Sequence, residues 1–496
     1  IRFYADSDQQ SIFDACNIII NDMKSGMYEY ETDGLIFTPK YFGVGQTLTD
    51  KRIKNYKHTW EYSLKWKPAK FNTIDFLIST KKTASGTDFI GNRFEEGIQV
   101  NQMSQISQYK TIILRVGYDK KKHGLLNPCQ DIINDEIQLK TDIDNEERYK
   151  PTQFYPSNPF DAQAGICNID LKLDKFGEYK MFTENGEIIE DNTIVEFSYN
   201  PLKQKFWRWS PLRVRYDKTA EYRNGFPQYG NAYHVADSNW HSIHNPVTEE
   251  MITKGENIPT KLDNDDIYYN NVGTKQDTST KALRDFHNLF VKYNLINMVS
   301  KEGDTLIDYA VGKGGDIPKW ISAKLSFVFG IDSSKDNIRN PLDGVCARYL
   351  NYKQRFDQIP DGLFIFGDSS ENIKDTSASK NEVGKSIINA IFGEGVKDSK
   401  VIGKGVAKSY GKVRDGFNIS SIQFALHYMF KSPETLHNFL TNLNECTGLN
   451  GYFIGTCFDG KKVFDLLKDL NINESYTFYS RDRKNKLLEI TKRYEN

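Results

Sequence analysis

Glycines and carboxylates follow three predicted strands in the C-terminal half of the chain. The string TLIDYAVGKGGDIPKW predicts a strand, a glycine-rich turn that includes Gly312, and the start of a helix. Glycines there let the backbone approach a ligand at the carboxyl edge of a sheet. Asp332 ends the next predicted strand, where an acid would bind the hydroxyls of a ribose. Asp368, followed by Ser369, ends a third predicted strand, where it would face the edge of an adenine. This order suits a nucleoside cofactor, although a glycine turn by itself is also an ordinary loop.

A second group of chemically capable residues is cationic and lies in the N-terminal half. The KWK segment puts Lys65 and Lys67 on one side of a strand, which suits a triphosphate. Arg213 and Arg215 alternate in the same way and would add two guanidinium groups. Taken separately, KWKP also fits an exposed edge strand protected by lysines, and RVRYDK a solvated face.

The elements that must position these residues change in kind along the chain. Residues 1–80 mix a helical pattern with two apolar strand runs, LIFT and TIDFLI, and residues 80–215 are predicted to be all β. Residues 220–280 are polar and without periodicity. From residue 280, strands alternate with helices, which predicts a parallel sheet with crossover helices. The Lys-, Gly- and Ser-rich residues 371–416 are expected to be a mobile loop, with an RNA-facing lid as the alternative.

Composition narrows the class of protein. The chain has 496 residues, 13% aromatics, a mean hydropathy of −0.60 and a formal net charge of −1. It is long enough for about three domains and too aromatic to be disordered. None of its six Cys form a CxxC pair, so neither a zinc ribbon nor a disulfide framework is expected, and we predict no metal-binding cluster of side chains. We expect a reduced, soluble protein without a membrane span, and the N-terminus IRFYADSDQQ suggests the interior of a longer polypeptide.

Four blocks in the C-terminal half resemble mRNA cap guanine-N7 methyltransferases: LRDFHNLFVK, VGKGGDIPKW, SSIQFALHYMF and LNGYFIGTCFDG. They occur in the family's order, and QFALHY is highly specific. The resemblance implies a Rossmann-like fold and S-adenosylmethionine (SAM) as cofactor. It assigns SAM contacts to Lys292, Asp308, Gly312, Asp332, Asp368, Ser369, Gln423 and Tyr428. It assigns contacts with the cap guanine to Asn288, Phe424, His427 and Tyr428.

The chemistry that this resemblance implies needs no catalytic side chain. Guanine N7 has a lone pair and the sulfonium is an activated methyl donor, so holding both in line is sufficient. Taken alone, His427 would equally be a core histidine. The chain departs from the family at Val311 and Asn418, where many members have Cys and Asp. The family also continues into a final strand pair with a Glu and an aromatic that hold the guanine, so we expect the cap pocket to be incomplete here.

Three blocks in the N-terminal half resemble mRNA guanylyltransferases: DGLIFTP, LKWKPAKFNTIDF and WSPLRVRYDKT, the last on their OB-fold domain. The resemblance implies GTP and Mg²⁺ as ligands. It assigns nucleotide or phosphate contacts to Asp33, Lys65, Lys67, Arg213, Arg215, Asp217 and Lys218. The family attaches GMP to a lysine in a KxDG motif, which this sequence does not contain, so no covalent lysine–GMP adduct is expected from it.

Together these blocks predict a fragment of a capping enzyme of the large-DNA-virus type, which joins guanylyltransferase to N7 methyltransferase. The fold class is α/β + β. We predict the C-terminal part of a nucleotidyltransferase domain at 1–78, an OB-fold at 79–225, an extended connection at 226–279 and a C-terminally incomplete methyltransferase at 280–496. Expected partners are the 5′ end of GpppRNA and a small stimulatory subunit, and the expected location is the cytoplasmic viral factory or the virion.

Two alternatives remain open from the sequence. One is a non-catalytic cap- or RNA-binding module, for which a SAM loop has no use. The other is a ribose 2′-O-methyltransferase, which needs a lysine base to deprotonate the hydroxyl. Lys313 or Lys385 would have to supply that base.

Overall fold

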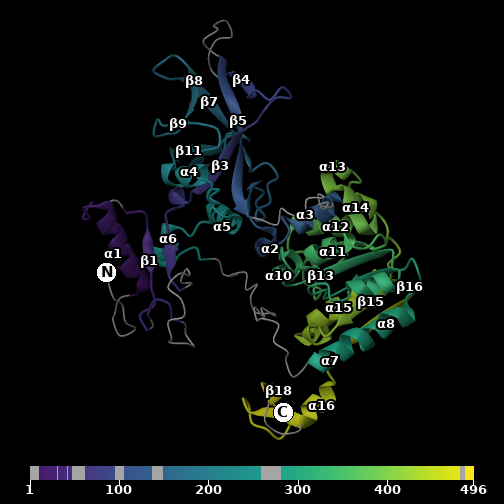
Figure 1. Ribbon diagram of the computed structural model, residues 1–496. Coiled ribbons are helices and arrows are strands. Elements are labelled where there is room, and N and C mark those ends of the chain that lie inside the picture. The colour runs from purple at the N-terminus through teal and green to yellow at the C-terminus, as the bar shows by residue number, and fades with distance from the viewer. Residues whose placement is uncertain are drawn as a thin grey trace. The chain divides into compact units, whose positions relative to one another are not determined.

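The computed structural model describes residues 11–30, 32–41, 43–46, 62–94, 106–136, 149–258, 281–480 and 486–495. The chain divides into two compact units, drawn in Figure 1. Unit 1 comprises Ile1–His123 and Asn145–Leu262, and unit 2 comprises Gly124–Asp144 and Asp263–Asn496. Among the described residues, no helix has both the length and the apolar character needed to cross a membrane.

The larger part of unit 1 is one antiparallel sheet built around a long central strand. Its strands are β3 (Ile74–Thr80), β4 (Ile90–Phe94), β5 (Ile106–Tyr118), β6 (Lys150–Gln153), β7 (Ile166–Leu173), β8 (Tyr179–Phe182), β9 (Ile188–Ile189), β10 (Ile194–Tyr199) and β11 (Trp209–Val214). The order is β11-β10-β3-β5-β7-β8-β9, with β4 and β6 also paired to β5. Three helices accompany the sheet: α2 (Lys120–His123), α4 (Tyr216–Arg223) and α5 (Tyr233–His244).

The core of this sheet is aromatic. Phe76 and Phe197 are fully buried on neighbouring strands, and Trp209 of β11 packs edge-on against Phe76 with ring centroids 5.1 Å apart. Trp240 of α5 closes the cluster and donates its indole N–H to the carbonyl of Pro159 at 2.9 Å. Burial alternates along β7 as a strand with one face on a core requires.

The remainder of unit 1 is a small layer with its own core. It contains α1 (Ile12–Lys24), the pair β1 (Leu35–Phe37) and β2 (Leu64–Trp66), the short helix η1 (Ala69–Phe71) and α6 (Glu249–Lys254). Ser11 and Asp14 form a capping box at the start of α1. Cys16, Ile20, Leu35 and Trp66 make up the core.

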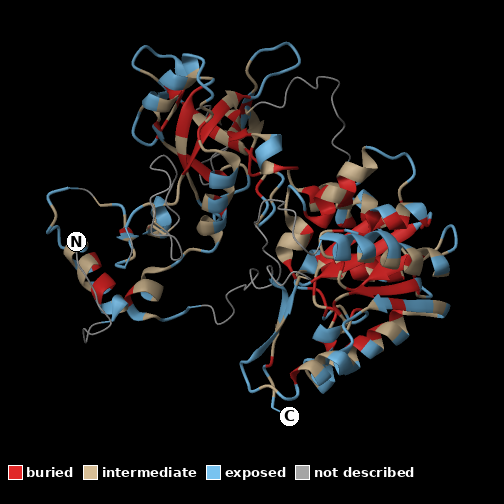
Figure 2. Cartoon of the chain, turned by 60° about the horizontal axis from the view of Figure 1, so that its bottom comes forward, coloured by how far each residue is buried: buried red, intermediate tan, exposed pale blue. Residues whose placement is uncertain are grey.

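Unit 2 is a five-stranded parallel sheet with helices packed on it. Its strands are β12 (Thr305–Asp308), β13 (Phe327–Asp332), β14 (Asp361–Phe366), β15 (Phe417–Gln423) and β16 (Thr447–Thr456), in the order β14-β13-β12-β15-β16. Almost every residue of β13 and β15 is buried, as expected for parallel strands covered on both faces (Figure 2). The helices are α3 (Pro128–Asn134), α7 (Lys281–Asp285), α8 (Lys292–Val299), α9 (Ile317–Ser322), α10 (Lys335–Arg339), α11 (Val345–Lys353), α12 (Glu382–Phe392), α13 (Ser399–Ile402), α14 (Lys404–Lys408), α15 (Pro433–Cys446) and α16 (Gly460–Leu467).

Two short helices and a hairpin complete unit 2. A π-helical turn, η3 (Phe286–Val291), joins α7 to α8, and the 3₁₀ turn η4 (Leu426–Phe430) follows β15. The hairpin of β17 (Ser475–Tyr479) and β18 (Lys486–Thr491) follows α16. The ammonium group of Lys492, almost fully buried, donates to the carbonyls of Lys468 and Leu470 and so ties β18 to the end of α16.

The described residues carry the helices and strands that the patterns predict, with three exceptions. The prediction that residues 80–215 are all β is wrong, because α2 and α3 lie between β5 and β6, and α3 buries Ile132 in the core of unit 2. The polar segment 226–279 holds α5 and α6 in its described part, because Ala236 and Trp240 repeat at helical spacing on a buried face; residues 259–280 lie outside the described residues. The expectation of a mobile loop at 371–416 is wrong. Ile387, Ile388 and Ile391 give α12 a buried face, and the segment forms α12 to α14 on the main core.

Candidate functional site

The predicted SAM residues gather at the carboxyl edge of the unit 2 sheet. Asp308 and Asp332 are the last residues of β12 and β13, Gln423 is the last of β15, and Asp368 follows β14 by two positions. The strand order reverses direction between β12 and β15, which is where open α/β sheets bind their ligands. The sheet therefore brings together at one edge residues that are more than a hundred positions apart in sequence.

Asp332 is the most heavily engaged of these carboxylates. It accepts the backbone N–H of Gly312 at 2.7 Å, the N–H of Ser334 at 2.9 Å and the side-chain amide of Asn337 at 3.0 Å. Burial raises its pKa, and the three donors partly oppose that rise. The bond to Gly312, which has a left-handed φ of +53°, fixes the glycine turn against the end of β13.

Asp368 and Ser369 follow the end of β14 and form hydrogen bonds there. The buried hydroxyl of Ser369 donates to the carbonyl of Tyr309 at 2.7 Å and so links the end of β14 to the end of β12. Asp368 accepts from both the N–H and the hydroxyl of Ser370. The hydroxyl of Ser369 therefore has its hydrogen engaged within the protein and can offer a cofactor only its lone pairs.

The QFALHY block lies where β15 turns into η4. The amide of Gln423 is held on both sides, by Ser421 at 3.1 Å and by Thr456 at 3.0 Å. Phe424 has a left-handed φ of +56°, a strained conformation for an aromatic residue. His427 and Tyr428 follow with their rings 4.1 Å apart, and burial lowers the pKa of His427, which keeps its imidazole neutral at pH 7.

A buried ion cluster connects the predicted cap and SAM residues. Asp316 accepts from Lys319 at 2.9 Å and from Lys292 at 3.2 Å, and Lys319 also donates to the amide oxygen of Asn288 at 2.8 Å. Asp316 and Lys319 are each about 5% exposed. Asn288 and Lys292 thus reach the same cluster from η3 and the first residue of α8, as their spacing of four predicts.

The carboxyl of Asp308 lies almost fully buried beside this cluster. Desolvation, and then repulsion from Asp316, raise the pKa of Asp308 to about 7, while a hydrogen bond from the N–H of Ala310 and the charge of Lys292 act in the opposite sense. Asp308 therefore gains or loses its proton near neutral pH.

Three residues of this region were not predicted from the sequence. Asp316 and Lys319 form the centre of the ion cluster, and the buried Asp–Lys pair at a spacing of three on the first turn of α9 was a usable signal within GGDIPK. His287 packs edge-on against Phe424 with ring centroids 5.0 Å apart, and its Nδ1 is buried without a hydrogen-bond partner among the described residues. Nothing in the sequence marks that contact in advance.

Neither lysine considered as a base is suited to that role. Lys313 pairs with Asp336 at 2.8 Å and Asp343 at 2.9 Å, and although burial favours its neutral form, these partners raise its pKa. Lys385 pairs with the exposed Glu382. A general base needs a lowered pKa, so this geometry disfavours ribose 2′-O chemistry.

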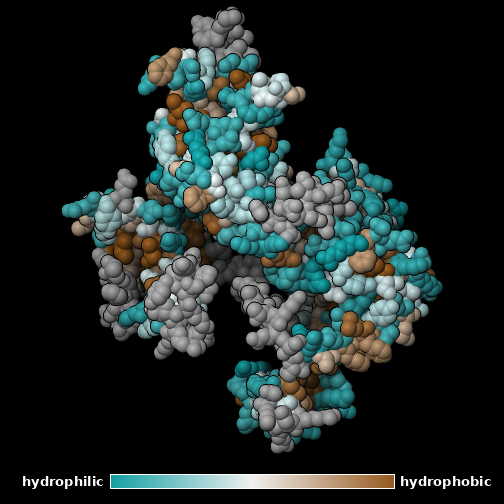
Figure 3. Space-filling model, viewed as in Figure 1, coloured by the Kyte–Doolittle hydropathy of each residue, from teal (hydrophilic) through white to brown (hydrophobic). Residues whose placement is uncertain are grey.

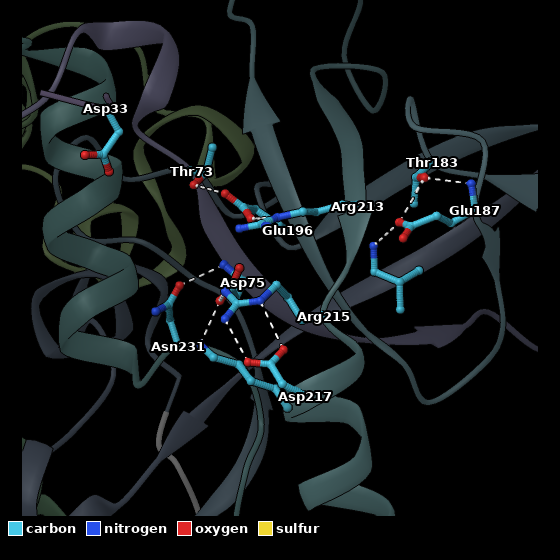
Figure 4. Close-up of polar contacts among 12 residues, drawn as sticks. Asp33, Thr73, Asp75, Thr183, Glu187, Glu196, Arg213, Arg215, Asp217 and Asn231 are labelled. Atoms are coloured by element: carbon cyan, nitrogen blue, oxygen red, sulfur yellow. Dashed lines mark hydrogen bonds and ion pairs between the residues drawn. The ribbon is translucent and has the colours of Figure 1, made fainter. Parts of the chain in front are cut away.

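In unit 1 the predicted phosphate-binding cations form a ladder of ion pairs across three strands (Figure 4). Arg213 of β11 donates to Glu196 of β10 at 2.7 Å, and Glu196 also accepts from Thr73. Arg215 and Lys218 both donate to the buried Asp75 of β3, at 2.5 and 2.7 Å. Burial works to raise the pKa of Glu196, but its two donors outweigh that effect and the pKa is lowered.

Asp217 also belongs to this ladder, whereas the remaining predicted residues lie apart from it. Asp217 pairs with Arg215 at 3.2 Å and so balances part of its charge. Lys67, just after β2, pairs with Asp33 at 2.5 Å, and this hydrogen bond lowers the pKa of Asp33. Lys65 is exposed on β2. The residues that the structure describes include no group of three His, Cys, Asp or Glu side chains able to hold a metal ion.

We expect the substitution Asp75→Ala to destabilise unit 1 by about 3 kcal/mol, because it leaves the largely buried Lys218 without its counter-charge and Arg215 with only the exposed Asp217. Asp88 is a matched control, since it also accepts from two lysines but is more exposed, at 29% of its side chain against 8% for Asp75. Asp88→Ala is expected to cost about 1 kcal/mol or less. Thermal unfolding of both variants measures the difference, and equal losses would contradict the buried-ladder account.

The sheet order, the glycine turn and the acids at its carboxyl edge define the C-terminal unit as a Rossmann-like, SAM-dependent methyltransferase fold. Residues 266–480 match the family model of the mRNA (guanine-N(7))-methyltransferase domain. The resemblance inferred from QFALHY and its neighbouring blocks is thereby confirmed for this part of the chain.

Curated relatives extend the likeness to the N-terminal unit. The chain is 27% identical over 487 residues to the probable mRNA-capping enzyme of Acanthamoeba polyphaga mimivirus, a match that covers 94% of this chain and 36% of the relative. It is 21% identical to the mRNA-capping enzyme of African swine fever virus (Badajoz 1971 Vero-adapted strain), over 85% of this chain and 40% of the relative. The mRNA cap guanine-N(7) methyltransferase of Eremothecium gossypii is 28% identical over 36% of this chain and 34% of its own length. The chain therefore spans roughly a third to two fifths of these relatives.

Proposed function

We propose that unit 2 transfers the methyl group of SAM to guanine N7 of an RNA cap, GpppRNA. The observation that carries the proposal is the convergence of Asp308, Asp332, Asp368 and Gln423 at one sheet edge, within the residues that match the N7-methyltransferase family model. A pure cap-binding module would have no use for this edge.

The residues present fit the proposed cofactor. Asp332 ends β13, where an acid would accept ribose hydroxyls. Its carboxylate and that of Asp308 would favour a cationic ligand, whereas the charge of Asp316 is already balanced by Lys292 and Lys319. SAM supplies a methyl group already activated on a sulfonium. The protein then has to hold the acceptor close and in line, and no proton has to be moved because N7 carries its own lone pair. For that reason we assign binding roles, and no general base, to these side chains.

The guanine is proposed to lie beside the aromatic residues that follow β15. Phe424 and the neutral His427 supply a stacking face and a hydrogen-bonding edge, and the buried Nδ1 of His287 has no partner in the described part of the protein. On α7 and η3, four apolar side chains are exposed, Leu283, Phe286, Leu289 and Phe290. Figure 3 shows brown and tan surface in the part of the molecule where Figure 1 labels α7 and α8. Asn288 connects this region to Lys319.

The direct test is methyl transfer from labelled SAM to short RNA ending in unmethylated GpppA, with the digested cap identified. We expect 7-methyl-GpppA from GpppA-RNA and no label on RNA ending in ApppA. Label on ribose would favour the 2′-O alternative. SAM binding without transfer would favour the non-catalytic binding module, and an absence of SAM binding would contradict the enzyme proposal.

For unit 1 we propose descent from an mRNA guanylyltransferase and its OB-fold domain. The proposal is supported by the nine-stranded antiparallel sheet and by relatives that are named capping enzymes and match 85–94% of the chain. In this role Arg213, Arg215 and Lys218 would bind the phosphates of GTP with Mg²⁺, and binding would have to compete with Glu196 and Asp75 for these cations. The test is to measure GTP affinity with and without Mg²⁺. If Glu196 competes with phosphate for Arg213, the substitution Glu196→Gln should increase that affinity.

A further inference from the structure

The segment Gly124–Asp144 is a part of unit 2 that the chain inserts between two strands of unit 1. In sequence it lies between β5, which ends at Tyr118, and β6, which starts at Lys150. By its contacts, however, its described part, residues 124–136, belongs to the compact unit that holds the parallel sheet. The domain boundaries predicted from sequence, with the methyltransferase confined to 280–496, do not include it.

The described part of this segment contributes side chains to the core of unit 2. Leu125 and Ile132 are 3% and 7% exposed and join the cluster that surrounds the parallel sheet. Gly405 is the second residue of α14, and a Cβ there would lie 2.1 Å from the carbonyl oxygen of Ile132. The backbones of α14 and α3 are therefore in direct contact at this point. Asp135 pairs with Lys353 at the end of α11 at 2.6 Å. The segment therefore contributes to the core of unit 2.

A pair of cysteines lies at the same interface. The sulfur of Cys129 on α3 is 2.8 Å from that of Cys346 on α11 and 3.6 Å from the carbonyl oxygen of Ile338. Cys346 is 1% exposed. The two thiols provide a chemical means of testing whether α3 is docked.

The segment contacts the loop that supports the glycine turn of the SAM site. The N–H of Leu125 donates to the carbonyl of Pro341 at 2.7 Å. Next to Pro341, the amide oxygen of Asn340 accepts from the N–H groups of Leu342 and Asp343 and so fixes the loop. Asp343 in turn pairs with Lys313, the residue after Gly312, at 2.9 Å.

Two further contacts hold the same turn. Asp336 of α10 pairs with Lys313 at 2.8 Å, and the guanidinium of Arg348 on α11 donates to the carbonyl of Lys313 at 2.9 Å. The N–H of Gly312 is bonded to Asp332, the acid proposed to bind the ribose. The contacts run without a break from Leu125 to this acid.

We propose that residues 124–135 act as a positioning segment for the SAM site, holding the 340–343 loop so that Lys313 and the glycine turn stay in place. This inference rests on the proposed function of unit 2 as a SAM-dependent enzyme. It extends that function by making cofactor binding depend on residues encoded within the predicted OB-fold region. Gly124 and Leu125 are positioning residues, since they act through Pro341 and do not themselves reach the sheet edge.

The main test replaces Gly124 in the full chain. Gly124 has a φ of +78°, and a Cβ there would lie 2.0 Å from the carbonyl oxygen of Pro341. Gly177 is a matched control, because its φ is +80° and nothing lies within 4 Å of its Cβ position. Both Gly→Ala changes impose the same left-handed strain, so the difference between them isolates the displacement of Pro341.

We expect Gly124→Ala to weaken SAM binding about 10-fold, measured as Kd on folded protein, and Gly177→Ala to leave it within about 2-fold. kcat at saturating SAM and saturating capped RNA should stay within about 2-fold of the unsubstituted chain. An unchanged Kd in folded Gly124→Ala protein would overturn the proposal. If the unsubstituted chain bound no SAM at all, the proposed function would fail instead.

If Gly124→Ala does not fold, Asp343→Asn tests the ion pair between Asp343 and Lys313, through which the 340–343 loop holds the glycine turn. The Asp343 side chain is 57% exposed, so its loss should not unfold the unit. We expect SAM binding to weaken about 3-fold, against no change in Glu382→Gln, which removes another exposed lysine pair. Equal Kd values in these two variants would overturn the proposal.

Docking of the segment can be measured independently of SAM. Diamide takes two electrons and two protons from a pair of thiols as their sulfurs join, and its N=N bond is reduced to the hydrazine. We expect a Cys129–Cys346 cross-linked peptide in the oxidised full chain and none in Cys129→Ser. Maleimide should label Cys129 more slowly than the exposed Cys457. Equal labelling rates and no cross-link would show that α3 is not docked and would overturn the proposal.

Discussion

The substitution Asp332→Ala is expected to weaken SAM binding at least about 100-fold. A hydrogen bond to a charged group contributes about 1.5–3 kcal/mol, and the substitution removes the carboxylate proposed to accept ribose hydroxyls. It also frees the N–H groups of Gly312 and Ser334, which the carboxylate holds at 2.7 and 2.9 Å. Equilibrium binding of labelled SAM to the full chain measures the effect.

Asp361→Ala is the matched control for this experiment. Asp361 is also a strand-terminal aspartate that accepts two hydrogen bonds, from Lys408 at 2.7 Å and Lys412 at 2.6 Å, but it starts β14 and therefore lies at the opposite edge of the sheet. Its loss should change the SAM Kd by less than about 2-fold. If both variants bound SAM equally well, or lost it equally, the assignment of the cofactor to the carboxyl edge would be wrong.

Much of the site in unit 2 could be predicted because its residues are tied to strand ends. Asp308, Asp332 and Gln423 each close an apolar run, and in a parallel sheet all such ends lie at one edge. The helix of Asn288 and Lys292 could be placed by its spacing, and both side chains do reach one cluster. Their roles toward SAM and guanine stay predictions.

What the sequence could not reveal depends on contacts between distant segments. Leu125 and Ile132 look like ordinary apolar residues of a β region, and only the fold places them in the core of unit 2. The cations Arg213 and Arg215 looked available for phosphate, because pattern reasoning does not identify Glu196 and Asp75 on neighbouring strands as their partners. Strand register decides the second point, because it places Glu196 opposite both Arg213 and Asp75, and register is set by long-range pairing.

The substitution Asp308→Asn is expected to stabilise unit 2 at neutral and alkaline pH. An aspartate in an unfolded chain has a pKa of about 3.9, whereas burial and then the charge of Asp316 raise the pKa of Asp308 to about 7 in the folded protein. The folded state therefore holds the proton more tightly. The stability that this proton provides is complete below about pH 4 and is lost as the pH rises to about 7.

Asparagine keeps the acceptor for the N–H of Ala310 and does not ionise, so the variant does not lose stability as the pH rises. Its advantage over aspartate should grow by about 1.4 kcal/mol per pH unit between pH 4 and 7 and level off near 4 kcal/mol. Thermal unfolding at pH 5, 6, 7 and 8 measures it. In Asp361→Asn, where Lys408 and Lys412 outweigh burial and lower the pKa, the variant should instead be less stable by an amount that is constant from pH 5 to 8. A pH-independent difference for Asp308→Asn would refute the raised pKa.

The same substitution should weaken SAM binding, which explains why a destabilising acid would be kept. The charged groups around Asp308 are Asp316, Lys292 and Asp332, and a cationic ligand beside them lowers the cost of ionising Asp308. SAM affinity of the unsubstituted chain should therefore rise with pH through about 7, whereas that of Asp308→Asn should be weaker and flat. A variant that is more stable yet binds its cofactor less well would identify Asp308 as a residue that serves ligand binding at the expense of the free energy of folding.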